Sequence, residues 1–147
     1  MRVALGGTFE PLHEGHKRLI DVAVKLGEVV IGVTSDEMAR RRLRPVLPYT
    51  IRAENVRRYV MRRYGFEPKI VRIDDPFGKT LEEDFDYIVV SPETYRTARM
   101  INEKRAEMGK RPIKIVIVDF VLAEDGKPIS ATRIKNGEID RYGRLIE

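Results

Sequence analysis

Both histidines of the chain lie in one short stretch, GGTFEPLHEGHKRLI, residues 6–20, and they are three positions apart. The glycine pair before them allows the backbone to approach a ligand closely. A helix that begins near His13 or the following residue would direct free N–H groups and the positive end of its dipole toward the same place. Because residues i and i+3 share a helix face, His13 and His16 can converge on one anion, and Thr8 adds a hydroxyl. The stretch therefore predicts a phosphate site.

These histidines have two other interpretations. Histidines at a helix start can simply cap the helix or pack against it. Their position after a double glycine, where a strand is expected to give way to a helix, favours the ligand site instead. A zinc site is disfavoured because helical metal pairs usually have i, i+4 spacing, and because the chain has no cysteine and no third histidine. The pattern therefore predicts no metal held by protein side chains.

The composition favours a single domain, residues 1–147, that binds an anion. The chain has 28 lysines and arginines against 23 acidic residues, a net charge of +5, which favours nucleotides, phosphorylated metabolites or nucleic acid as partners. It has no cysteine, which suits a reducing cytoplasm, and we expect a cytoplasmic protein. No apolar stretch reaches the length of a membrane span or a signal peptide, so no membrane association is expected. The oligomeric state stays open.

Five apolar runs alternate with stretches of helical periodicity and predict the elements that position the histidines. The predicted strands cover residues 2–5, 28–35, 69–73, 86–91 and 113–122. The predicted helices cover residues 14–26, 37–43, 51–64, 92–108 and a short segment from about 130, with connections at 44–50 and 74–85. Such alternation requires a parallel sheet with helices on both faces, so the fold class is α/β. Ligands of such sheets bind beyond the carboxyl ends of the strands.

Local signals refine this outline. Ser35 or Asp36 can cap the short second helix. Ser91, Pro92 and Glu93 have the pattern of a helix cap, a first-position proline and a first-turn acid. The fifth apolar run is too hydrophobic for an edge strand, which predicts an interior position in the sheet.

Two motifs resemble the signatures of the HxGH nucleotidylyltransferase superfamily. GGTFEPLHEGH at 6–16 resembles G-T-F-x-P/D…H-x-G-H, and ISATRI at 129–134 resembles I-S-S/T-T-x-I. The first follows the first predicted strand, and the second follows the fifth. The segments IVVSPETYRTARMIN and ISATRIKNGEID are similar to the archaeal and eukaryotic type of phosphopantetheine adenylyltransferase (pantetheine-phosphate adenylyltransferase). This resemblance extends from Val3 to about Asp140.

The resemblance implies a Rossmann-like parallel five-stranded sheet and a reaction. AMP would pass from ATP to 4'-phosphopantetheine, giving dephospho-coenzyme A and pyrophosphate, with Mg²⁺ accompanying ATP. ATP and 4'-phosphopantetheine are the implied partners. The substrate phosphate is itself the nucleophile in such a reaction. The protein therefore has chiefly to position two polyanions and to stabilise the charge that develops on the α-phosphate.

The resemblance also assigns roles in the first motif. His13 and His16 would contact the ATP phosphates, with His16 acting on the α-phosphate in the transition state. Thr8 would bind ATP and orient the incoming phosphate of the acceptor. Gly7 would lie against ATP, and Phe9 against 4'-phosphopantetheine.

In the second motif, the resemblance implies that Ser130 and Thr132 bind the β- and γ-phosphates through hydroxyls and helix N–H groups, with Arg133 nearby. Taken alone, the motif would be an N-capped helix. Ala131 stands where a serine is common, and Lys135 stands where an arginine is common. The positive charge is kept at position 135, but the hydroxyl at position 131 is lost, so binding of the triphosphate would depend more on backbone N–H groups.

Two groups of arginines are further phosphate candidates. Arg96 and Arg99 have i, i+3 spacing, and the resemblance implies that Arg96 binds the acceptor phosphate and Arg99 binds ATP. A solvated helix face is the alternative. In the basic run ARRRLR, residues Arg41, Arg42 and Arg44 are uncertain substitutes for a lysine that the bacterial branch uses, because such runs usually form a solvated surface.

Two rival functions stay open. The first is another nucleotidyltransferase of the superfamily, a cytidylyltransferase or a nicotinamide-mononucleotide adenylyltransferase, which the segments SPETYR and KNGEID disfavour. The second is a non-catalytic nucleic-acid-binding protein. It is disfavoured because the aromatic residues are few and do not alternate with the basic ones, so nucleic acid is not an expected partner.

Overall fold

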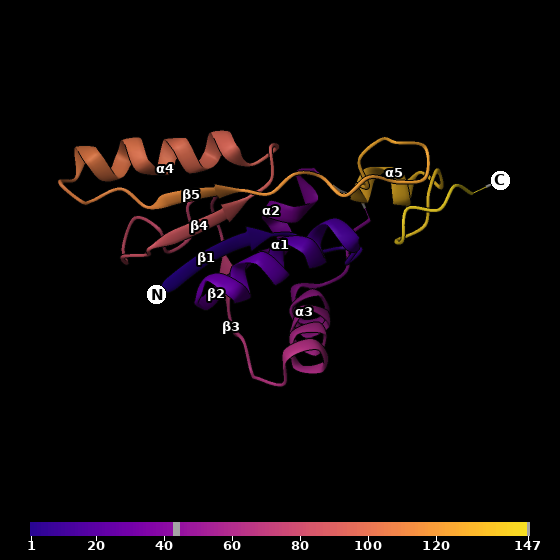
Figure 1. Cartoon of the computed structure of the whole chain (residues 1–147), viewed down its shortest axis with the longest axis horizontal. Helices are drawn as coiled ribbons and strands as arrows, with labels where there is room; N and C mark the ends of the chain where they lie inside the picture. Colours follow the sequence, from indigo (N-terminus) through magenta and orange to yellow (C-terminus); the bar gives the residue numbers. More distant parts are fainter. Residues whose placement is uncertain (43–44, 147) are drawn as a thin grey trace.

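A five-stranded parallel sheet forms the centre of the computed structural model, which describes residues 1–42 and 45–146 (Figure 1). The strands are β1 (Arg2–Gly7), β2 (Glu28–Thr34), β3 (Lys69–Ile73), β4 (Tyr87–Val90) and β5 (Lys114–Ile117), in the order β3-β2-β1-β4-β5. The predicted α/β fold with five parallel strands is confirmed. The chain moves outward from β1 to β3 and then continues on the other side of β1, so the topological switch point lies between β1 and β4.

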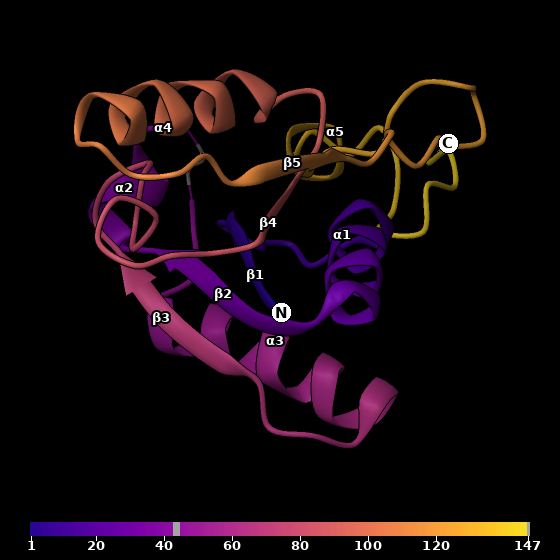
Figure 2. The same cartoon turned by 60° about the vertical axis from the view of Figure 1, so that its left-hand side comes forward.

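Helices cover both faces of the sheet, as predicted (Figure 2). The described helices are α1 (Glu14–Leu26), α2 (Asp36–Arg40), α3 (Tyr49–Tyr64), α4 (Tyr95–Glu107) and α5 (Ala131–Lys135). Successive strand side chains point to opposite faces. Val3 and Leu5 therefore pack with side chains of α1 and α3. Ala4, between them, packs with side chains of α4 on the other face.

The position of β5 contradicts the prediction of an interior strand, because β5 is at an edge of the sheet. It is also shorter than the predicted 113–122. The apolar residues that follow it serve other purposes: Val118 joins the core of the α1 face, and Phe120 and Leu122 are exposed. The hydrophobic run is therefore divided between a short strand and an extended connection.

Helix α4 begins at Tyr95 with Thr94 at the N-cap position, so the predicted start at Ser91 and Pro92 is wrong. The Ser91 N–H donates to the Thr94 hydroxyl oxygen at 3.1 Å, which makes these residues part of a turn between β4 and the helix. In contrast, Ser35 caps α2 as expected, because its hydroxyl accepts the Met38 N–H at 3.2 Å.

Helix α3 begins at Tyr49, two residues before the predicted start, and its buried stripe also differs from the prediction. Ile51 is 45% exposed, and Arg52 is fully buried in line with Val56 and Val60. This rotation of α3 places the Arg52 guanidinium in the core. That cation bonds to groups at the carboxyl ends of the strands, as described below.

The second motif lies in a small unit at the C-terminus, residues 118–146, which has its own apolar cluster. Ala123, Ile129 and Ile139 form this cluster, and Ile134 of α5 packs against it. Figure 1 shows α5 beyond the carboxyl ends of the strands. Within residues 1–42 and 45–146, no helix has both the length and the apolar character needed to cross a bilayer.

Candidate active site

His13 is the N-cap residue of α1. Its Nδ1 accepts the backbone N–H groups of Gly15 at 3.0 Å and of His16 at 3.4 Å. His16 completes a capping box, because its own Nδ1 accepts the His13 N–H at 3.3 Å. Capping and a ligand role are compatible here. A neutral imidazole whose Nδ1 accepts a hydrogen bond carries its proton on Nε2, so each ring keeps an Nε2–H donor.

The two imidazoles are stacked, with ring centroids 3.7 Å apart and planes 20° from parallel. The predicted convergence of the pair is therefore present. Burial lowers the pKa of His13 to about 4. Burial is also the main cause of the lowered pKa of His16, assisted by repulsion from His13 and opposed by the Pro11 carbonyl. Both rings are neutral donors at pH 7 in this structure. His13 is buried and His16 only half-buried, which makes His16 the more accessible of the two.

The first N–H groups of α1 are not free, contrary to the prediction. Those of Gly15 and His16 bond to His13, and the Glu14 N–H donates to the Arg141 carbonyl at 3.4 Å. At this helix end, the Nε2–H groups of the two histidines are therefore the available donors in place of the backbone N–H groups. A phosphate here would meet the imidazole edges and the helix dipole instead of bare backbone donors.

The lowered pKa of His13 predicts a pH-dependent stability. The unfolded chain binds a proton on this residue near pH 6.5, whereas the folded chain does so only near pH 4. The unfolded state therefore binds more protons in this window, and the free energy of unfolding should fall by about 3 kcal/mol as the pH falls through it. Urea denaturation at several pH values from 7.5 to 4.5 measures this fall. His13→Asn, which retains a capping side chain, should have a clearly shallower profile. Equal slopes in the two proteins would contradict the assignment.

Thr8 lies just beyond β1, beside the end of β2. Its hydroxyl oxygen is 2.9 Å from that of Thr34. Arg52 holds this pair of residues, because its guanidinium donates to the Thr8 carbonyl and to the Thr34 hydroxyl. Arg52 also donates to Asp36 at 2.9 Å, and this hydrogen bond is the main reason that the pKa of Asp36 is lowered. Thr8 is half-buried and stands at the edge where a ligand is expected.

The sequence motifs did not identify Thr34 and Arg52 as residues of the candidate site. A hydroxyl at the carboxyl end of the strand beside β1 is a usable signal for Thr34, since the parallel register places Val33 opposite Gly7. For Arg52 the signal is its i, i+4 spacing from Val56 on the apolar stripe of α3. Such a cation needs buried acceptors, and those available lie around Thr8.

Phe9 lies close to His16, and Gly7 lies against Phe9. The Phe9 side chain is 1% exposed, and its ring centroid is 5.1 Å from that of His16. Its side chain therefore supports the first motif from within the core. A side chain at Gly7 would come within 3.1 Å of the Phe9 ring, so the glycine allows this close packing.

In the second motif, Ser130 caps α5 by accepting the Arg133 N–H at 3.2 Å. Thr132 is exposed on the first turn. The Arg133 guanidinium donates to Asp125 and to the Pro128 carbonyl. Its ion pairs with Asp125 and Glu138 stabilise the C-terminal unit, and its expected contact with the ATP phosphates stays a prediction.

The two motifs meet through Lys135. Its Nζ is 2.7 Å from the buried Glu10 carboxylate in the first motif, and it also donates to the Pro45 carbonyl at 2.7 Å. A side chain at Gly15 would lie 3.9 Å from the Ile129 carbonyl oxygen. The start of α1 is therefore directly beside the second motif, more than a hundred residues away in sequence.

The remaining arginine candidates that the structure describes lie on the surface of the molecule. Arg96 is exposed on the first turn of α4, and the Arg99 guanidinium carbon is 6.0 Å from the centre of the Tyr95 ring. Arg41 is exposed and pairs with Glu37 at 3.7 Å, and Arg42 is exposed. Arg44 lies outside the described residues. Arg96 and Arg99 follow β4 and hence flank the switch point, whereas Arg41 and Arg42 follow α2.

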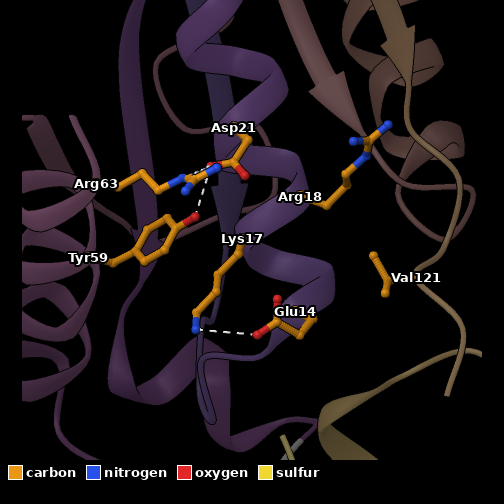
Figure 3. A pocket seen from close by; sticks show the side chains of 7 residues that line it. All are labelled: Glu14, Lys17, Arg18, Asp21, Tyr59, Arg63 and Val121. Carbon is orange, nitrogen blue, oxygen red and sulfur yellow. Dashed lines mark hydrogen bonds and ion pairs between the residues drawn. The ribbon is translucent and has the colours of Figure 1, made fainter. Parts of the chain in front are cut away.

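A groove of about 410 Å³ lies elsewhere, between α1, α3 and the segment after β5 (Figure 3). Several of its charged groups have partners within the groove: Arg63 pairs with Asp21 at 3.7 Å, and Lys17 pairs with Glu14 at 3.5 Å. Asp21 also accepts a hydrogen bond from Tyr59. Neither histidine lines this groove. It is therefore distinct from the candidate site.

Comparisons with known proteins agree with this arrangement. A family model described as cytidylyltransferase-like matches residues 4–137. The phosphopantetheine adenylyltransferase of Archaeoglobus fulgidus is 72% identical over 99% of this chain and 100% of its own length. The chain belongs to the phosphopantetheine adenylyltransferase family. The resemblance inferred from the two motifs is thus confirmed.

Other members of the phosphopantetheine adenylyltransferase family are also similar over nearly the whole chain. The Methanosarcina mazei enzyme of that name is 51% identical over 98% of this chain and 96% of its own. A solved structure of a protein of unknown function from A. fulgidus is 71% identical, with a TM-score of 0.79 over 81% of this chain and 90% of that one. At 24% identity and a TM-score of 0.64, a Thermoplasma volcanium structure titled as a lipopolysaccharide core biosynthesis protein shares the fold.

Proposed function

We propose that this protein transfers AMP from ATP to 4'-phosphopantetheine and releases dephospho-coenzyme A and pyrophosphate. The observation that carries the proposal is the 72% identity to a phosphopantetheine adenylyltransferase over its full length. The meeting of the two motifs around Glu10 and Lys135 supports it, since the reaction requires donors on both sides of one triphosphate.

In this reaction, an oxygen of the acceptor phosphate attacks the α-phosphorus of ATP. A new phosphorus–oxygen bond forms while the bond to the bridging oxygen breaks, and pyrophosphate leaves. His13 and His16 would donate their Nε2–H groups to the ATP phosphates, with His16 closest to the α-phosphate. Ser130 and Thr132 would bind the β- and γ-phosphates. Donors fixed in advance by capping bonds stabilise developing charge without reorganisation.

The acceptor would enter beside the switch point. Thr8 would direct its hydroxyl to the acceptor phosphate, with Arg96 as the cation that binds this phosphate and the Phe9 backbone nearby. Gly7 and Arg99 would contribute to the ATP site. Arg41 and Arg42 are weaker candidates because both are exposed and Arg41 pairs with Glu37.

Mg²⁺ would accompany ATP and neutralise charge on the phosphates. It usually keeps several waters and binds phosphate oxygens, so it needs few protein ligands. Among residues 1–42 and 45–146, no group of three or more histidine, aspartate or glutamate side chains is placed to hold a metal. We also propose that the enzyme is cytoplasmic and that its partners are its two substrates, without nucleic acid.

A substrate screen tests the function. Purified protein with ATP and Mg²⁺ should release pyrophosphate only when 4'-phosphopantetheine is added, because that acceptor supplies the nucleophile. Nicotinamide mononucleotide, and CTP with a polyol phosphate, are the matched controls. Faster release with either control would replace the proposed function by that of another nucleotidyltransferase. Omission of Mg²⁺ should reduce the rate in the same assay.

A further inference from the structure

Arg52 is a buried cation that contacts two residues of the candidate site, Thr8 and Thr34, from the protein interior. It is 0% exposed, and its Nη1 donates to the Thr34 hydroxyl at 3.1 Å and to the Thr8 carbonyl at 3.2 Å. Its other donors bind Asp36 at 2.9 Å and the Leu47 carbonyl at 2.8 Å. A guanidinium has no acceptor atom, so the direction of each of these bonds is fixed.

The fixed bond from Arg52 determines what the Thr34 hydroxyl can do. Thr34 is 6% exposed, and its oxygen already accepts the arginine N–H. Its proton needs an acceptor, because a buried donor without a partner is costly. The Thr8 hydroxyl oxygen, 2.9 Å away, is in reach. Donation from Thr34 to Thr8 would satisfy this proton.

The Thr8 hydroxyl is restricted in the same way. Once Thr8 accepts from Thr34, its own proton must point to a different partner. Thr8 is half-buried at the ligand edge of the sheet, so this proton is available to an incoming anion. The three residues form a directional chain, Arg52 to Thr34 to Thr8, that ends at the candidate site. Bonds in such a chain polarise one another, and the cation at its start makes Thr8 a better donor.

We propose that Thr34 is a positioning residue of the adenylyltransferase: by donating to Thr8, it orients the Thr8 hydroxyl as a donor to the substrate phosphate. The proposal rests on the proposed function. The register of β1 and β2 makes the contact possible, because Gly7, the last residue of β1, is opposite Val33. Thr8 and Thr34 directly follow these two residues and are therefore neighbours. A hydroxyl at position 34 is required, and the methyl group is not.

Two substitutions separate this role from packing. Thr34→Val keeps the shape and removes the hydroxyl, so kcat should fall on the order of tenfold while the KM for ATP stays within about twofold. Thr34→Ser keeps the hydroxyl and loses the methyl group, so it should restore kcat to near the wild-type value. If Thr34 only packs, the ranking reverses, with Val active and Ser impaired. Thermal unfolding of both variants verifies that each is folded at the assay temperature.

A double-mutant cycle with Thr8→Val completes the test. If Thr34 acts through Thr8, adding Thr34→Val to Thr8→Val should lower kcat by less than about twofold further. Full additivity of the two losses would overturn the proposal, as would a wild-type kcat in Thr34→Val. Wild-type protein is assayed in parallel. Absence of pyrophosphate release from the wild type would contradict the proposed function itself. An active wild type together with a fully active Thr34→Val would contradict only the positioning role of Thr34.

Discussion

Replacing His16 with alanine should lower the turnover of AMP transfer by about a hundredfold, while the protein stays folded. The His16 ring is half-buried, and its Nδ1 is held by the His13 N–H, which leaves the Nε2–H donor fixed in direction. Loss of one preorganised donor to a transition-state oxyanion typically costs a factor of 10² to 10³. Because the donor acts mainly on charge that develops during transfer, the loss should appear in kcat more than in KM. Pyrophosphate release under saturating ATP and 4'-phosphopantetheine measures it.

A matched variant separates this effect from helix capping. His16→Glu keeps a capping-box acceptor at the third position of α1, so its stability should be close to that of the wild type. It has no donor and adds a negative charge, so its turnover should fall at least as far as that of His16→Ala. Turnover of His16→Ala within about fivefold of the wild type would remove His16 from the mechanism.

His13→Asn should separate capping from catalysis at the first histidine. Asparagine is among the best N-cap residues, so the bonds to Gly15 and His16 can be replaced, and the free energy of unfolding at pH 7.5 should change by less than about 1 kcal/mol. The Nε2–H donor and the ring that stacks on His16 are both lost. We therefore expect turnover to fall by about a hundredfold, with a raised KM for ATP.

His13→Ala provides the comparison, since it loses the cap as well as the donor. It should match His13→Asn in turnover and lie about 1 kcal/mol below it in stability, measured by urea denaturation at pH 7.5. If His13 only caps α1, His13→Asn will retain nearly full turnover and His13→Ala alone will be impaired. That result would leave His16 as the single imidazole in the mechanism.

Local patterns in the sequence predicted the five strands, α1 and the two motifs that resemble phosphate-binding signatures, whereas the histidine cap that the structure shows was the disfavoured interpretation. These features depend on spacing within a few residues: apolar runs, a glycine pair, and a hydroxyl at a helix start. Where the prediction was wrong, a competing tertiary contact was the reason. The apolar run at 113–122 is shared between an edge strand and the C-terminal unit.

By itself, the sequence determined the alternation of strands and helices and the positions of the two candidate phosphate motifs along the chain, because residue types and their spacing specify both. Only the tertiary structure decided which side chains connect them. Lys135 meets Glu10 across 125 positions of sequence and Arg52 reaches Thr8 across 44. No local pattern encodes such contacts, because they depend on strand order, on the rotation of α3 and on the buried acceptors that a charged group must find.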